Sequence, residues 1–129
     1  MSGPKRLLLV DDYADSLEMW AIFLRSSGYD VVTAMTGLEA IERAETTRPD
    51  LVLLDLQLPE VSGVEAARRL RASSATAHIP LIAVTGYSQP KEHDEARAAG
   101  FDRVIVKPCE PAALLAEVES ILGTSDAPV

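Results

Sequence analysis

Cysteine, aromatic side chains and long hydrophobic stretches are all scarce in this sequence of 129 residues. Its one cysteine, Cys109, excludes an internal disulfide framework and any metal site that needs several cysteines. Apolar runs such as Leu7–Val10 are far shorter than the roughly 20 residues that a membrane-spanning helix needs. The same run is too short to be the hydrophobic part of a signal peptide. We therefore expect a cytoplasmic protein with no membrane contact.

Basic residues are also in short supply, since 12 Lys and Arg residues face 20 Asp and Glu residues and leave a net charge of −8. This excess of negative charge disfavours direct binding to nucleic acid. Glycine-rich phosphate loops of the P-loop and dinucleotide-binding types are absent. The composition, 47% hydrophobic and 25% charged, is typical of one globular domain of this length. We expect that domain to span residues 1–123 and the short polar tail 124–129 to be disordered.

Short apolar runs that lie near Asp, Gly or Pro indicate buried β-strands. These runs are Leu7–Val10, Val31–Ala34, Leu51–Leu54, Leu81–Val84 and Val104–Val106. Each run is followed by a segment with apolar residues at helical spacing. These segments are Asp15–Ser27, Gly37–Thr47, Val64–Ala72, Lys91–Ala99 and Pro111–Leu122.

Strands that alternate with helices predict an α/β fold, in which right-handed crossovers join parallel strands. Five such units are too few for a closed eight-stranded barrel. The sequence therefore predicts a (βα)₅ fold, a doubly wound parallel five-stranded sheet with strand order 2-1-3-4-5. In open sheets of this kind, ligands bind outside the carboxyl ends of the strands.

Polar side chains follow four of the predicted strands. Asp11 and Asp12 follow the first strand, Asp55 follows the third, Thr85 ends the fourth and Lys107 follows the fifth. Because these strands are consecutive in the predicted order, we expect the carboxylates to converge at one edge of the sheet. Lys107 is then two strands, about 10 Å, from Asp55, and its long flexible side chain spans much of that gap.

Carboxylates this close to one another repel unless a cation neutralises them. Oxygen ligands without nearby His or Cys favour Mg²⁺, Mn²⁺ or Ca²⁺ over zinc, and a short, open carboxylate site suits Mg²⁺ best. A metal ion opposite Lys107 and the Thr85 hydroxyl would clamp a phosphoryl group, and the central Asp55 would be its nucleophile. The residues thus indicate a Mg²⁺-dependent site for phosphoryl transfer.

Several segments occur in a specific order and spacing over nearly the whole chain. They are Leu8–Asp12, Asp50–Gly63, Pro80–Gly86, Ala98–Asp102 and Val106–Pro108. Together they resemble the receiver (CheY-like) domain of two-component response regulators. The resemblance implies a flavodoxin-like fold and a function in phosphorelay signal transduction. It also implies two partners: a sensor histidine kinase or histidine phosphotransfer protein as donor, and a downstream protein target. The protein would be a monomer or a weak phosphorylation-linked dimer.

The resemblance assigns roles to the polar residues at the strand ends. Asp55 would accept a phosphoryl group from a phosphohistidine. Asp11, Asp12 and the backbone carbonyl of Gln57 would join Asp55 in holding Mg²⁺. Lys107 would pair with the phosphoryl oxygens. The chain would then be a signalling protein that catalyses only its own phosphorylation and dephosphorylation.

The resemblance also predicts how phosphorylation is read out. Thr85 would move toward the phosphoryl group and bias a surface around the fourth helix. The small Gly86 would leave the phosphoryl group accessible, and a cis bond would precede Pro108. Val104 departs from the family because many receivers have a Tyr or Phe there, so the usual aromatic rotamer change is absent.

Gln57 and Tyr87 occupy the variable positions that flank the phosphoryl group in this family. Side chains there hinder or assist an attacking water molecule. Because both residues are bulky, we predict slow loss of the phosphoryl group. A phosphorylated half-life of seconds would contradict this expectation.

Other functions fit parts of the pattern. A Mg²⁺-dependent phosphatase with an aspartyl nucleophile typically needs a second Asp two residues later, where this chain has Gln57. A flavodoxin-like FMN carrier would need a hydroxyl-rich phosphate loop where Asp11 and Asp12 stand. A non-phosphorylated receiver-like binding module would have no need of the intact acidic, threonine and lysine positions.

The remaining notable side chains are expected to be structural. Asp15 is expected to be a helix N-cap or a turn residue, Cys109 a small buried hydrophobe rather than a redox sensor, and His78 and His93 solvated surface residues. Hydrophobic residues off the main stripe of the first helix are expected to pack against the last helix, with an exposed docking patch as the alternative; they are Met19, Ile22 and Phe23. A basic run should form a solvated helix face; it consists of Arg68, Arg69 and Arg71.

Overall fold

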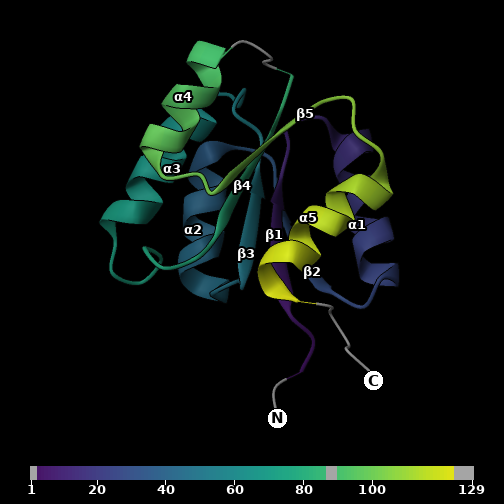
Figure 1. Ribbon diagram of the computed structural model, residues 1–129. Helices are drawn as coiled ribbons and strands as arrows, with labels where there is room; N and C mark the ends of the chain where they lie inside the picture. The colour runs from purple at the N-terminus through teal and green to yellow at the C-terminus, as the bar shows by residue number, and fades with distance from the viewer. Residues whose placement is uncertain (1–2, 87–89, 124–129) are drawn as a thin grey trace.

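The computed structural model describes residues 3–86 and 90–123, so the tail 124–129 and Tyr87 lie outside the described residues. Within these ranges, five strands alternate with five helices (Figure 1). The strands are β1 (Arg6–Val10), β2 (Asp30–Ala34), β3 (Leu51–Leu54), β4 (Leu81–Thr85) and β5 (Arg103–Val106). The helices are α1 (Ala14–Ser26), α2 (Gly37–Thr47), α3 (Gly63–Ala72), α4 (Pro90–Ala99) and α5 (Pro111–Leu122). All neighbouring strands are parallel and their order is β2-β1-β3-β4-β5, which confirms the predicted topology.

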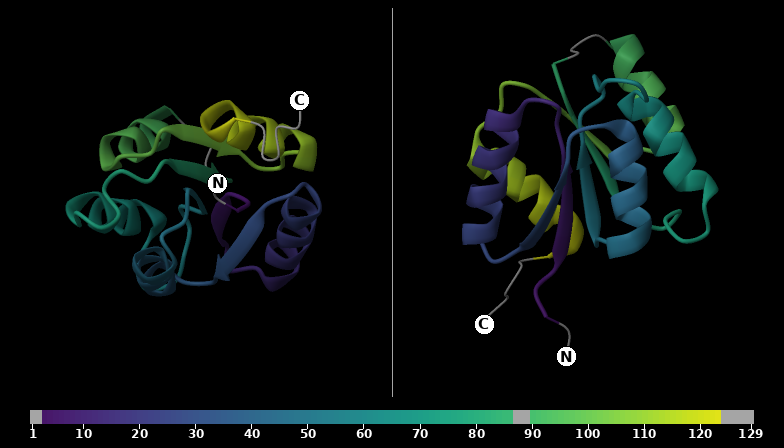
Figure 2. Two further views of the ribbon diagram at one scale, coloured as in Figure 1. Left: turned by 90° about the horizontal axis from the view of Figure 1, so that it is seen from below. Right: turned by 180° about the vertical axis from the view of Figure 1, so that it is seen from behind.

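Helices cover both faces of the sheet. Helices α1 and α5 lie on one face, and α2, α3 and α4 lie on the other (Figures 1 and 2). The residues of strand β1 are apolar without alternation because both faces of the strand are covered. Leu7 and Leu9 belong to the hydrophobic cluster beneath α1 and α5, whereas Leu8 and Val10 belong to the cluster on the opposite face. Successive side chains of a strand point to opposite faces, so a doubly covered strand buries every residue.

Two of the helices begin with a side chain that caps their first turn. The hydroxyls of Thr36 and Ser62 each accept a backbone N–H three residues further on, at 3.0 and 3.1 Å, and so cap α2 and α3. The expected cap of α1 is wrong. Helix α1 begins at Ala14, Tyr13 occupies the N-cap position without a side-chain hydrogen bond, and Asp15 lies within the first turn.

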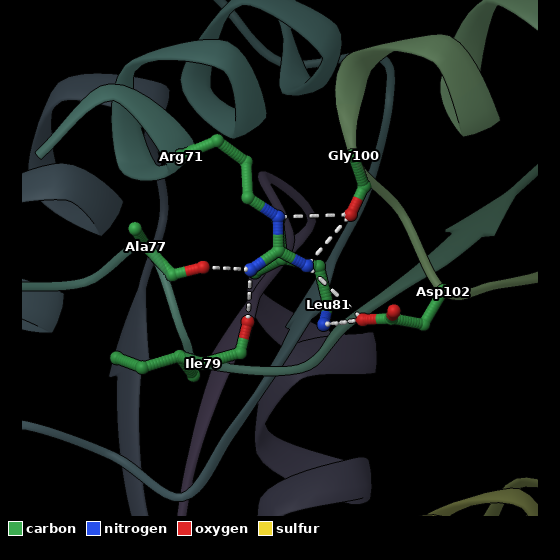
Figure 3. Close-up of polar contacts among 6 residues, drawn as sticks. All are labelled: Arg71, Ala77, Ile79, Leu81, Gly100 and Asp102. Carbon is green, nitrogen blue, oxygen red and sulfur yellow. Dashed lines mark hydrogen bonds and ion pairs between the residues drawn. The ribbon is translucent and has the colours of Figure 1, made fainter.

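Arg71 at the end of α3 is not the solvated residue that the basic run predicts (Figure 3). Its guanidinium donates hydrogen bonds to the backbone carbonyls of Ala77 and Ile79, both at 2.7 Å, and of Gly100 at 2.7 and 3.1 Å. It also donates to Oδ2 of Asp102 at 3.1 Å. These five residues, here called the Arg71 cluster, fasten the end of α4 to the segments that lead into β4 and β5.

The surface of α1 also differs from expectation. Met19 and Ile22 are 54% and 58% exposed, so the prediction that they pack against α5 is wrong. The inward face of α1 is set by helical periodicity and contains Leu17, Trp20, Ala21 and Leu24, which leaves positions 19 and 22 on the outside. Phe23 is partly buried against the α1–α5 cluster, as expected. No helix among the described residues is long and apolar enough to cross a membrane.

Candidate functional site

The carboxyl end of β1 presents two adjacent carboxylates. Asp11 is only 5% exposed, and its backbone N–H donates to the carbonyl of Ala34 at 3.2 Å. Its Oδ1 accepts the backbone N–H of Tyr13 at 2.9 Å. This hydrogen bond fixes the Asp11 carboxylate against the start of α1. Asp12, the next residue, is exposed.

The carboxyl end of β3 presents Asp55, which is 6% exposed. Its Oδ1 accepts the backbone N–H of Gln57 at 3.0 Å, so the loop after β3 holds the carboxylate in place. Gly63 allows this loop to fold back, because a Cβ there would collide with the carbonyl of Asp55 and with Leu56. Sequence reasoning included Gly63 in a family pattern but did not recognise this close approach.

Lys107 reaches across the sheet edge to both buried carboxylates. Its Nζ donates to Oδ2 of Asp11 and to Oδ2 of Asp55, each at 3.0 Å. Its backbone N–H donates to the carbonyl of Thr85 at 2.7 Å, which holds the end of β5 beside β4. The Lys107–Pro108 bond is cis, as the resemblance predicts. The structure therefore brings Asp11, Asp55 and Lys107 into direct contact.

Thr85 and Gly86 lie where β4 ends. Thr85 is fully buried, whereas Gly86 is exposed. The nearest atom to a Cβ placed on Gly86 would be Oε1 of Gln57 at 3.8 Å, so there is open space at this position. Gln57 and Asp12 are exposed as well, and the site therefore opens to solvent on this side. Val104, at the position where an aromatic residue is common, is half-buried against the α2–α3–α4 cluster.

Negative charge is concentrated at this edge. One carboxylate oxygen from each of Asp11, Asp12 and Asp55 lies within 4.8 Å of the others. Burial raises the pKa of Asp55, and the charge of Asp11 adds to this effect, although hydrogen bonds from Gln57 and Lys107 oppose it. Burial by itself would lower the pKa of Lys107, but its hydrogen bonds with Asp55 and Asp11 and their charges outweigh burial and raise it. The ammonium thus stays charged and offsets only part of the carboxylate charge.

The donor atoms at this edge are chemically suited to a hard divalent cation. Asp11, Asp12 and Asp55 offer carboxylate oxygens without a sulfur or imidazole ligand in the described cluster. Such oxygen sets favour Mg²⁺ over zinc, because Mg²⁺ binds to one or two carboxylates, water and phosphate oxygens. The residues present therefore fit a Mg²⁺ ion.

Comparison with known proteins gives a consistent family. Residues 7–119 match the response regulator receiver domain. The polar-differentiation response regulator DivK of Brucella anthropi is 35% identical over 120 residues, which cover 93% of this chain and 98% of DivK. The chemotaxis protein CheY4 of Vibrio cholerae is 30% identical with a TM-score of 0.86, covering 91% of this chain and 98% of CheY4. A further match is the receiver domain of sensor histidine kinase PA1611 from Pseudomonas aeruginosa, whose structure has a magnesium ion coordinated in the active site cleft. It is 30% identical with a TM-score of 0.86, and the match covers 95% of this chain and 99% of that domain.

The fold and the acidic strand ends define a receiver-type domain, and the chain belongs to the response regulator receiver domain family. Its function is therefore phosphorelay signalling as a receiver domain. None of these relatives is a phosphatase or an FMN carrier, so the alternative functions gain no support.

Proposed function

We propose that Asp55 is the phosphoacceptor of this receiver domain. The observation that carries this assignment is the contact of one ammonium with two buried carboxylates, since Nζ of Lys107 is 3.0 Å from both Asp11 and Asp55. Asp55 occupies the central strand end and lies beside the exposed residues Gln57 and Gly86. It is thus the buried carboxylate that an incoming phosphoryl group can reach.

The other residues act on the charge that phosphorylation adds. Asp11, Asp12, Asp55 and the backbone carbonyl of Gln57 would hold Mg²⁺, which would supply positive charge to the carboxylates and the phosphoryl oxygens. The magnesium ion described for the receiver domain of PA1611 supports this assignment. Lys107 turns its ammonium from the carboxylates toward a phosphoryl oxygen, and the hydroxyl of Thr85 moves toward another.

The donor in this proposal is a phosphohistidine of a sensor kinase or a histidine phosphotransfer protein. The P–N bond of the donor breaks, a P–O bond to a carboxylate oxygen of Asp55 forms, and the released imidazole takes up a proton. Hydrolysis later transfers the phosphoryl group to water and regenerates the carboxylate. The domain, which we assign to residues 1–123, works in the cytoplasm. It signals to a downstream protein as a monomer or weak phosphorylation-linked dimer.

The experiment is incubation with acetyl phosphate and Mg²⁺ followed by intact mass measurement. The unaltered protein should gain the mass of one phosphoryl group, and alkali should remove it because acyl phosphates are labile to base. Asp55→Asn should gain none. Asp50→Asn is the matched control, because Asp50 lies before β3 and accepts the backbone N–H of Arg6 at 2.7 Å, far from the strand ends. An unaltered protein that stays unlabelled by acetyl phosphate and by phosphohistidine donors would contradict the proposal.

A further inference from the structure

Two hollows have Lys107 among their lining residues. The inner one has a volume of about 10 Å³ and lies beneath the site, between Asp11, Trp20, Lys107 and Leu114 and the apolar floor of the sheet. The outer one is an open groove of about 420 Å³ between α1 and the segment after β5, and Met19, Trp20, Lys107 and Cys109 contribute to its lining. Trp20 and Lys107 line both hollows, so these two residues lie where the hollows adjoin.

Trp20 is well placed to restrict the lysine. It is 8% exposed and belongs to the cluster that contains Leu9, Leu53, Val84 and Leu114, and therefore it is fixed by packing on the sheet. Lysine has a flexible four-carbon stem, and its ammonium occupies one place only when that stem is confined. The inner hollow has space for about one water molecule, so the stem has little room to move inward.

We propose that Trp20 is a positioning residue that holds the stem of Lys107 so that Nζ stays at the strand ends. This inference rests on the proposed function, because it assigns Trp20 an effect only through Lys107. Loss of the indole would join the inner hollow to the outer groove. The lysine stem would then sample conformations in which Nζ points away from Asp55. Displacement of a reacting group by about 1 Å can lower a rate by up to about 100-fold.

The test compares phosphorylation rates by acetyl phosphate at saturating Mg²⁺ in a double-mutant cycle. Trp20→Leu should lower the maximal rate roughly tenfold while leaving the donor concentration at half-maximal rate unchanged. Trp20→Phe, which keeps a flat ring where the hollows adjoin, should recover most of the rate. In the Lys107→Met background, which keeps the stem but removes the ammonium, Trp20→Leu should have less than about a twofold further effect.

A control separates this role from stability. Leu24 lies on the same inward face of α1, is fully buried and lines neither hollow. Leu24→Ala should destabilise the fold but leave the phosphorylation rate of the folded protein unchanged. Because the Lys107→Met variants are expected to react slowly, intact mass is followed over hours so that their rates can still be measured.

Two results would overturn the inference and are distinguishable. An equal loss from Trp20→Leu in both backgrounds would show that Trp20 does not act through Lys107, and would leave the proposed function intact. A normal rate for Lys107→Met alone would instead remove the role assigned to Lys107, and the role of Trp20 with it.

Discussion

At each end of the sheet, one long basic side chain joins segments that are distant in sequence. The groups that these two side chains bind are different. At the amino end, Arg71 donates to the carbonyls of Ala77, Ile79 and Gly100 and to one carboxylate (Figure 3). At the carboxyl end, Lys107 faces the carboxylates of Asp11 and Asp55, with that of Asp12 nearby.

The difference in partners separates a structural cluster from a responsive one. The guanidinium donors of Arg71 are paired with carbonyl acceptors, so the hydrogen bonds of the Arg71 cluster need no ligand from outside the protein. Among the described residues at the other end, carboxylates outnumber the ammonium, so the negative charge there is only partly offset. The cation binding and phosphorylation that we propose for this carboxyl end would change its balance of charge.

The largest effect on stability is expected from Arg71→Met. It should lower the free energy of unfolding by about 2 kcal/mol, because several partly buried carbonyls lose their donor. Arg69→Met is the matched control, since Arg69 makes an exposed ion pair with Glu65 and should change stability by less than about 0.5 kcal/mol. Urea denaturation followed by circular dichroism measures both. If both variants lose equally little stability, the Arg71 cluster does not stabilise the fold as inferred here.

Lys107→Met should separate chemistry from stability. We expect phosphorylation by acetyl phosphate to slow on the order of 100-fold, because charge on the transferring group loses its ammonium. Mg²⁺ should also stabilise this variant more than it stabilises the unaltered protein, since the ammonium no longer competes with it for the carboxylates. Lys91→Met on the exposed surface of α4 is the control. Equal phosphorylation rates for the two lysine variants would refute the expectation.

The same chemical change, Asp to Asn, should have opposite effects at the two ends when divalent ions are chelated. Asp55→Asn should raise the free energy of unfolding by on the order of 1 kcal/mol, because it removes a buried charge that lies beside Asp11. Asp102→Asn should lower it, because Oδ2 of Asp102 accepts from Arg71 at 3.1 Å and from the backbone N–H of Leu81 at 2.9 Å. Thermal unfolding in chelator measures the sign of each change.

The pH dependence of Asp55→Asn has a definite sign. Burial raises the pKa of Asp55 above its ordinary value of 3.8, so the folded protein retains its proton at a pH where the unfolded chain has lost it. The unaltered protein should therefore lose stability relative to Asp55→Asn as the pH rises from 3.8 through the folded pKa, with no further change above it. A stability difference that does not vary over this window would be inconsistent with a raised pKa.

The smallest effect is expected at Gln57, which is exposed beside Gly86. We predict that the phosphorylated protein persists for minutes or longer and that Gln57→Ala shortens its lifetime severalfold, because water then reaches the phosphoryl group more easily. Intact mass followed over time after removal of the donor measures the lifetime. A half-life of seconds in the unaltered protein would disprove the prediction.

The predictable parts of the structure are those governed by short-range patterns. The run Leu51–Leu54 is apolar throughout because both faces of β3 are covered, and its length and position match the prediction. The strand-end rule predicted that Asp11, Asp55 and Lys107 converge, since parallel strands end at the same edge of a sheet.

The less predictable parts depend on contacts that the local pattern does not contain. Arg71 follows Arg68 and Arg69 in sequence, yet the carbonyls that it binds come from a loop and from the end of α4, up to 29 positions away. Trp20 lies on the inward face of α1 by helical spacing, but its place beside Lys107 depends on how α1 sits relative to the segment after β5. Met19 and Ile22 were expected to pack against α5, but they lie outside the inward face of α1 and are exposed.

The separation of the charged partners along the chain has a consequence for biosynthesis. Lys107 is 96 positions from Asp11 and 52 positions from Asp55. A ribosome releases the chain from its N-terminus, so Asp11 and Asp55 emerge well before the lysine that partly offsets their charge. A nascent chain without β5 has the acidic residues and the strands that carry them but not the ammonium. Because Lys107 follows β5, we expect the acidic site to reach its full phosphorylation rate only once β5 has joined the sheet.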